Sequence, residues 1–286
     1  MTSHRIALIT DSTCDIPQTL LDTYDITVVP LLILWGDEVL RDRIDLQPQA
    51  FYQRLTEDPM HPKTAHPNPP RFARAYEEAR ENGAQEIVMI TISSEMSGTF
   101  NAAQQAAKQV DIPVYCLDAR GPTMSLGWQV LAAARAREAG GDAQAMLAAA
   151  KKVRQGLVQL VCLDTLEYLH KGGRIGGATR FIGTLLHVKP IVYIDHEAGR
   201  VEPATQVRTR SRALETLYGQ FFEQLDTRKP LHIAVLHGDA LEDAQRMAQR
   251  IRRDYAPAEL LISITGPVLG VHTGPGAIAL CGYAEG

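Results

Sequence analysis

Short apolar runs alternate with segments of helical periodicity along the first half of this chain. Within the helical segments, apolar residues recur three or four positions apart. The predicted strands are residues 5–10, 26–35, 86–92 and 113–118, and the predicted helices are residues 48–57, 72–83 and 98–110. Parallel strands need a crossover of this kind, usually a helix, to connect them. The order of elements therefore predicts an α/β fold whose first sheet is mainly parallel.

Strands and helices are also predicted in the second half of the chain, after a shift in composition. Two helices, near 122–139 and 142–154, lead to a strand at 157–163, which is followed by a glycine-rich and basic stretch. Further strands are predicted near 189–194, 231–236 and 258–263, with helices near 211–225 and 240–253. A chain of 286 residues is slightly long for one domain. We expect two α/β domains, residues 1–155 and 156–286.

Composition and charge exclude several classes of function. The net charge is −4, and the lysines and arginines are scattered, so we expect no nucleic-acid partner. The four cysteines lie far apart and the first residues lack the pattern of a secretion signal, which favours a reduced, cytoplasmic protein. No apolar run approaches the roughly 18 residues of a membrane-spanning helix. Any contact with lipid is expected through a pocket or a transient membrane-surface contact.

Three serines, Ser93, Ser94 and Ser97, lie between a predicted strand and a predicted helix. The carboxyl edge of a parallel sheet is where open α/β folds bind ligands, and helix N-termini attract anions. Serine is also a common helix cap, so capping and ligand binding both remain open for these hydroxyls. Residues 11–13 follow the first strand at the same edge, and we interpret them as turn and cap residues that form a wall.

Other site chemistries find little support in the sequence. Ser97 lacks the glycine two positions earlier that a hydrolase nucleophile elbow needs. The glycine-rich stretch near 170–180 does not end in the Gly-Lys-Ser/Thr of a phosphate loop, and residues 273–279 match a dinucleotide fingerprint only in part. His61 and His66 flank a proline-rich loop without a carboxylate cluster at ligand spacing. We expect no metal and no nucleotide cofactor.

Seven segments spread over the chain carry a resemblance to a known family. They are ITDSTCDIP, KTAHPNP, ISSEMSGTFNAA, LEYLHKGGRIG, VKPIVYID, VRTRSRAL and GPVLGVHTGPGAIAL. In their order and spacing, from about residue 5 to 283, the chain resembles the DegV family of bacterial fatty-acid-binding proteins. The resemblance implies a two-domain α/β protein that buries a long-chain fatty acid, such as palmitic or stearic acid, between its domains.

The resemblance also implies a partner and a mode of action. The lipid-binding protein would present the acyl carboxylate to a separate fatty acid kinase subunit, which makes an acyl phosphate for phospholipid synthesis. On this interpretation the chain is not itself an enzyme and has no catalytic residue of its own. It would need no cofactor besides the fatty acid ligand.

Five residues match functional positions of the family. Thr64 and Ser97 match the hydroxyls that hold the carboxylate, and His272 matches a histidine close to the head group. Arg174 and Arg208 match arginines linked with the kinase encounter or with phosphoryl transfer. Three of the five also have an ordinary structural interpretation. Thr64 could order a turn, His272 could be a satisfied core histidine, and Arg208 could lie on a solvated helix face.

The chain departs from the family pattern at two places near these residues. Ala65 and His66 replace the usual Ser and Gln after Thr64, which could retune the head-group environment. Met96 stands where Leu is usual before Ser97, and its flexible side chain could adapt the tail channel. Two alternatives stay open: a serine-dependent acyl hydrolase or transferase that uses Ser97, and a related fold that binds a different small carboxylate.

Overall fold

The computed structural model describes residues 5–184 and 188–286. Its first sheet has the order β2-β1-β6-β7, and every neighbouring pair is parallel. The strands are β1 (Ile6–Asp11), β2 (Ile26–Val29), β6 (Glu86–Thr91) and β7 (Val114–Asp118). Their apolar side chains alternate between the two faces of the sheet, as the strand geometry requires. The predicted α/β fold with a parallel first sheet is confirmed.

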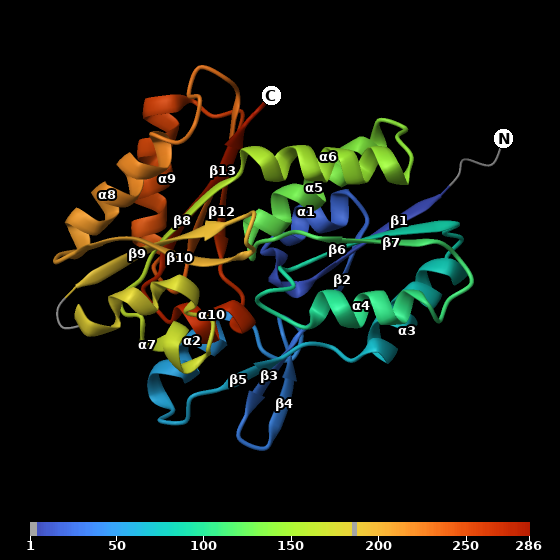
Figure 1. Ribbon diagram of the computed structural model, residues 1–286, viewed down its shortest axis with the longest axis horizontal. Coiled ribbons are helices and arrows are strands. Elements are labelled where there is room, and N and C mark those ends of the chain that lie inside the picture. The colour runs from blue at the N-terminus through green and yellow to red at the C-terminus, as the bar shows by residue number, and fades with distance from the viewer. Residues whose placement is uncertain (1–4, 185–187) are drawn as a thin grey trace.

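Helices cover both faces of this sheet (Figure 1). One face, with Ile87 and Met89, packs against α3 (Pro69–Glu81) and α4 (Thr99–Ala107). The other face, with Val88 and Ile90, packs against helices that include α1 (Gln18–Thr23), α5 (Met124–Glu138) and α6 (Ala143–Gly156). Residues of opposite parity on one strand therefore support two separate helical layers.

A second sheet of six strands follows, in the order β10-β9-β8-β13-β11-β12. Its strands are β8 (Val158–Cys162), β9 (Lys189–Asp195), β10 (Arg200–Val207), β11 (Leu231–His237), β12 (Glu259–Ile264) and β13 (Ile278–Ala284). Only the pairing of β11 with β12 is parallel. One face packs against α8 (Arg210–Phe222) and α9 (Leu241–Tyr255).

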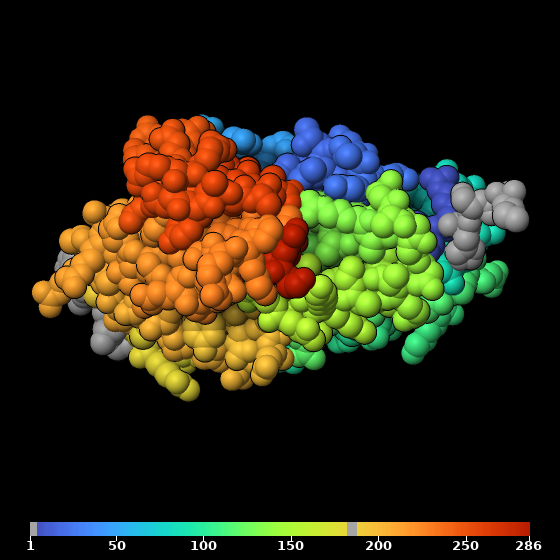
Figure 2. All heavy atoms as spheres, turned by 90° about the horizontal axis from the view of Figure 1, so that it is seen from above, coloured from blue at the N-terminus to red at the C-terminus, as the bar shows by residue number. Residues whose placement is uncertain are grey.

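The opposite face of the second sheet shares its core with α5 and α6, which therefore contact both sheets. Figure 2 shows the C-terminal end of the chain, in red, lying against the lime-green segment that includes α6. There Lys152 Nζ donates a hydrogen bond of 3.2 Å to the carbonyl of Gly286. Strands β1 to β7 precede residue 155 and strands β8 to β13 follow it. The division into domains at that residue stays a prediction.

A small antiparallel sheet, with the order β4-β3-β5, corrects two expectations. Its strands are β3 (Leu32–Trp35), β4 (Glu38–Arg41) and β5 (Lys63–Ala65). The run 26–35 is two strands in two different sheets, separated at Pro30, which has no N–H to offer a ladder. The proline-rich segment 61–70, expected to be a loop, contains β5, in which Thr64 pairs with Ile33.

Helices from both halves of the chain pack beside this small sheet. Helix α2 (Pro48–Glu57) and helix α10 (Pro267–Thr273) share an apolar cluster with Ile33 and Trp35. At the start of α10, the Val268 N–H donates to the Asp42 carboxylate at 3.3 Å, and the buried site raises the pKa of Asp42 to about 7. Helix α7 (Glu167–Lys171) and the 3-10 segment η2 (Gly176–Thr184) complete this region. The packing fixes α10, which carries His272, against the first half of the chain.

None of the helices formed by the described residues is both long and apolar enough to cross a membrane.

Candidate functional site

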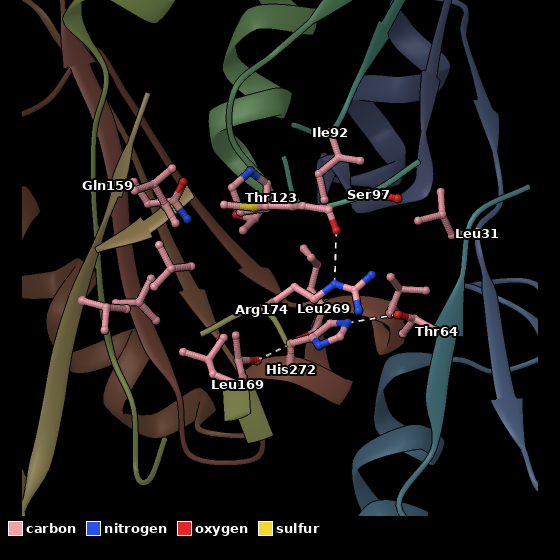
Figure 3. Close-up of a pocket in the computed structure, with 18 of the residues that line it drawn as sticks. Leu31, Thr64, Ile92, Ser97, Thr123, Gln159, Leu169, Arg174, Leu269 and His272 are labelled. Atoms are coloured by element: carbon pink, nitrogen blue, oxygen red, sulfur yellow. Dashed lines mark hydrogen bonds between the residues drawn. The ribbon is translucent and has the colours of Figure 1, made fainter. Parts of the chain in front are cut away.

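A cavity lies where elements from both halves of the chain converge (Figure 3). Its empty space, including the open mouth, is about 850 Å³. The lining side chains come from the small sheet, the loop before α4, strands β8 to β10 and helix α10. They include Leu31, Thr64, Ala65, His66, Ile92, Met96, Ser97, Thr123, Gln159, Val161, Leu163, Leu169, Arg174, Val192, Ile194, Val201, Val268, Leu269 and His272. Most are apolar, as is usual for a ligand pocket.

Thr64 and His272 meet at one end of the cavity, 208 positions apart in sequence. Thr64 Oγ1 lies 3.0 Å from His272 Nε2, within hydrogen-bond distance. Strand β5 positions the threonine and helix α10 positions the histidine. Thr64 therefore lies in a strand of the small sheet, and its hydroxyl faces the cavity (Figure 3).

The His272 ring is held in a tight, poorly solvated place. Burial, followed by the positive charge of Arg174 and the proximity of His61, lowers the pKa of His272 to about 4. A Cβ at Gly172 would lie only 2.0 Å from His272 Nδ1, so glycine is the residue that fits there. At neutral pH the imidazole is thus uncharged, and it can take part in a hydrogen bond to Thr64 without adding a charge to the site.

Ser97 lies in the loop before α4, where its hydroxyl contacts the first residue of the helix. Ser97 Oγ accepts a hydrogen bond from the Thr99 N–H at 3.3 Å and lies 2.8 Å from Thr99 Oγ1. The same side chain lines the cavity. We refer to Thr64, Ser97 and His272 together as the hydroxyl end of the cavity.

The other two serines of this loop, Ser93 and Ser94, form hydrogen bonds outside the cavity lining. Ser93 donates to the carbonyl of Gly199 at 2.6 Å, and Ser94 donates to a carboxylate oxygen of Asp118, also at 2.6 Å. The carboxylate of Asp11, as expected for a cap residue, accepts from the Thr13 N–H at 2.9 Å. These contacts anchor the loop and its neighbours, so Ser97 is the serine of the three that faces the cavity.

Arg174 lies at the mouth of the cavity and links two of its walls. Its Nε donates to the carbonyl of Met96 at 3.1 Å, and its Nη1 donates to the carbonyl of Gly172 at 2.8 Å. Its side chain is exposed, and it also lines a shallow surface groove that Ser97 shares. A positive charge therefore lies beside the hydroxyl end, where the cavity meets the surface.

The opposite side of the cavity is built from the six-stranded sheet. Val161, Leu163, Val192 and Ile194 face the cavity, and Val161 pairs directly with Val192. We call these four residues the strand wall. They were not among the sequence-predicted site residues, because residues 157–163 are apolar apart from Gln159 and do not show which face of the strand lines a cavity.

The remaining predicted residues fall in different places. His66 and Met96, where the chain departs from the family pattern, both line the cavity. Arg208 lies at an exposed position between β10 and α8, and it is absent from the cavity lining. Within the described ranges, no three His, Cys, Asp or Glu side chains are grouped to hold a metal ion.

Comparison with known proteins identifies the relatives of this fold. The family model described as an uncharacterised protein of the DegV family matches residues 5–285. The chain belongs to the DegV family. A DegV domain-containing protein of Streptomyces coelicolor is 38% identical over 285 residues, which cover 97% of this chain and 98% of that protein. The resemblance found in the sequence is thus confirmed.

Solved DegV structures share the whole architecture. A DegV family protein from Thermus thermophilus, described as binding fatty acid, has a TM-score of 0.92 at 33% identity, covering 98% of this chain and 100% of its own. DegV of Bacillus subtilis, a fatty acid binding protein, has a TM-score of 0.91 at 30% identity, covering 99% and 100%. The fold that places Thr64, Ser97 and His272 around one cavity is therefore a DegV fold.

Proposed function

We propose that this DegV family chain binds a long-chain fatty acid in the cavity, with the carboxylate at the hydroxyl end and the tail along the strand wall. The observation that carries this proposal is the pairing of a polar end with an apolar wall in one cavity. Fatty-acid binding by the DegV proteins of Thermus thermophilus and Bacillus subtilis supports it.

The two parts of the cavity would contribute differently to binding. Burying the methylenes of palmitic acid, at about 0.8 kcal/mol each, contributes about 11 kcal/mol before ordering costs. A hydrogen bond to a charged group contributes about 1.5–3 kcal/mol. The tail therefore supplies most of the affinity, and the hydroxyls of Thr64 and Ser97 determine where the carboxylate stops.

The proposal includes presentation of the carboxylate to a separate fatty acid kinase for acyl phosphate formation in phospholipid synthesis. Two observations support it: Ser97 and Arg174 line both the cavity and the adjoining surface groove, and His272 is neutral at physiological pH because its pKa is lowered. A carboxylate held there by neutral groups keeps its nucleophilic character. Arg174 at the mouth could stabilise charge that develops during phosphoryl transfer.

A Ser97-dependent acyl hydrolase or transferase is the alternative class. A serine nucleophile needs a base within hydrogen-bond reach. The Ser97 hydroxyl contacts Thr99, whereas His272 is directed to Thr64. The geometry therefore favours binding over nucleophilic catalysis at this serine.

Native mass spectrometry of the purified protein tests these possibilities together. The proposal predicts a noncovalent mass of fatty-acid size that extraction with organic solvent removes. A covalent acyl adduct on Ser97 after treatment with an activated ester would support the enzyme instead. Chain-length analysis of the extracted ligand separates a long-chain fatty acid from another small carboxylate, which would contradict the proposal.

A further inference from the structure

A polar side chain, Gln159, interrupts the apolar surface that faces the proposed fatty-acid tail. Gln159 lies on β8, two positions before Val161 and four before Leu163, and all three line the cavity. It is 2% exposed. Figure 3 shows it on the opposite side of the cavity from Thr64 and Leu31. At about 3.3 Å per residue of extended chain, Gln159 lies about 13 Å from Leu163.

The side-chain amide of Gln159 is held at one of its two polar atoms. Its Oε1 is hydrogen-bonded to the hydroxyl of Ser125, which also lies 2.7 Å from His196 Nε2. Burial lowers the pKa of His196 to about 4, so this histidine is neutral at physiological pH. These contacts lie on the cavity-facing side of the sheet, at the start of α5, and they hold the amide plane.

The second polar atom, Nε2, is buried and has no hydrogen-bond partner in the described parts of the chain. A buried amide group without a partner is costly, because it loses its hydrogen bonds to water and gains none in return. A saturated tail that fills the cavity would leave Gln159 in this state. A tail with a polar group at the right depth would satisfy it.

We propose that the cavity selects a fatty acid with a hydroxyl group in the distal half of its chain, and that Gln159 recognises this hydroxyl. The inference rests on the proposed function, because the carboxylate at Thr64 and Ser97 sets how far along the chain Gln159 acts. A hydroxyl can accept from an amide N–H or donate to an amide oxygen. The ligand hydroxyl can therefore form a hydrogen bond with the Gln159 amide whether its nitrogen or its oxygen faces the cavity.

Two other occupants are less suited to this position. A cis double bond offers an N–H group only a weak π contact, which is a second-order interaction. An ordered water would need two or more polar partners, whereas the neighbouring cavity residues Val161 and Ile194 are apolar. In the experiment below, a preference for oleic acid would indicate the double bond. Equal binding of stearic acid and its hydroxy isomers would be consistent with a water.

Competition binding measured by native mass spectrometry tests the proposal. Delipidated protein receives stearic acid together with oleic acid or one hydroxystearic acid, with the hydroxyl near the carboxylate, at mid-chain or towards the methyl end. The proposal predicts that a distal isomer displaces stearic acid with about a 5- to 150-fold preference. The isomer hydroxylated next to the carboxylate should show no such preference.

Two variants locate the effect. Gln159→Met removes the amide while keeping a similar, flexible volume, and it should abolish or reverse the preference for the distal isomer. Gln105→Met changes an exposed glutamine on α4 that is not among the cavity-lining residues, and it should keep the preference. Thermal unfolding shows whether each variant is folded. The competition with the wild-type protein tests the preference even if a variant does not fold.

The outcomes separate this inference from the proposed function. Equal binding of stearic acid and every hydroxy isomer, or a preference for oleic acid alone, overturns the role of Gln159 and leaves fatty-acid binding intact. A preference that persists in Gln159→Met also overturns it. If no acid of the series binds, the proposed function fails and this inference fails with it.

Discussion

The hydroxyl end and the strand wall of the cavity are assembled in contrasting ways. In the hydroxyl end, Thr64 lies on a three-residue strand, Ser97 in a loop and His272 on a seven-residue helix. The strand wall takes Val161 and Val192 from neighbouring strands of one regular sheet. Continuous strands form a broad apolar surface, whereas short elements converge from distant parts of the chain. The contrast suggests that affinity and positioning can be changed separately.

Shortening the ligand should give the largest effect, because it removes contacts to the strand wall only. Replacing palmitic acid by octanoic acid removes eight methylenes, worth up to about 6 kcal/mol. We expect a Kd weaker by about a hundredfold to ten thousandfold, measured by calorimetry with delipidated protein. Nearly equal affinities would mean that the wall does not hold the tail.

Removing a hydroxyl should give an intermediate effect that depends on the ligand's head group. Thr64→Val or Ser97→Ala leaves a carboxylate oxygen short of a partner, at a cost of about 1–3 kcal/mol, or about 5- to 150-fold in Kd. The double variant should lose less than the sum, because both hydroxyls serve one group. The methyl ester should bind all these variants and the wild type with similar affinity.

The ester comparison is also the control for folding. A single lost cap at Ser97 costs about 1 kcal/mol of stability, so the variants should remain folded in thermal melts. An unchanged preference for the acid in both single variants would return Ser97 to the role of a helix cap and Thr64 to that of a strand residue.

The pKa of His272 should depend on whether the head group of the bound ligand is a carboxylate or a methyl ester. A bound carboxylate favours the protonated imidazole, so the pKa of His272, about 4 in the structure, should be higher with palmitic acid than with its methyl ester. The acid complex then binds more protons, and the preference for acid over ester rises as pH falls towards that pKa. The rise stays below tenfold, the limit that a pKa difference of one between the two complexes allows. Protonation of the carboxylate itself ends the rise.

NMR titration of the His272 ring in the two complexes measures this difference. His196, which contacts Ser125 and not the hydroxyl end, also has a pKa lowered to about 4, and as the internal control it should titrate alike in both complexes. Identical His272 pKa values with acid and ester would contradict a carboxylate at the hydroxyl end.

Arg208 should have the smallest effect on binding, because it lies outside the cavity lining. Arg208→Ala is expected to leave the fatty-acid content unchanged and to lower acyl-phosphate formation in an assay reconstituted with a fatty acid kinase. A loss of bound lipid would place Arg208 in the binding site. Unchanged values in both assays would leave it as an exposed residue without a role.

The sequence predicted the regular parts of this molecule well. Helix α2 was predicted with the same bounds, and the four parallel strands were found because apolar runs and helical periods are local signals. Strand β5 was missed because its ladder to Ile33 is a tertiary contact inside a segment whose prolines indicate a loop. Local patterns cannot encode such a pairing.

The candidate site likewise contains residues that the sequence indicated and contacts that only the tertiary structure shows. Thr64, Ser97, His272 and Arg174 were proposed through the family resemblance, and the structure gathers them around one cavity. No local pattern links Thr64 to His272, because their contact depends on helix α10 packing beside the small sheet. Gln159 was overlooked because a glutamine within an apolar strand gives no sign of whether its amide has a partner.

A crystal structure with palmitic acid brominated on its terminal carbon tests the central claim most directly, because bromine can be located by its anomalous scattering. We expect the carboxylate within hydrogen-bond distance of Thr64 and Ser97. We expect the bromine peak at the far side of the cavity, beside the strand wall and Gln159. A bromine peak beside Thr64, or lipid bound only outside the cavity, would contradict the proposed placement of head group and tail.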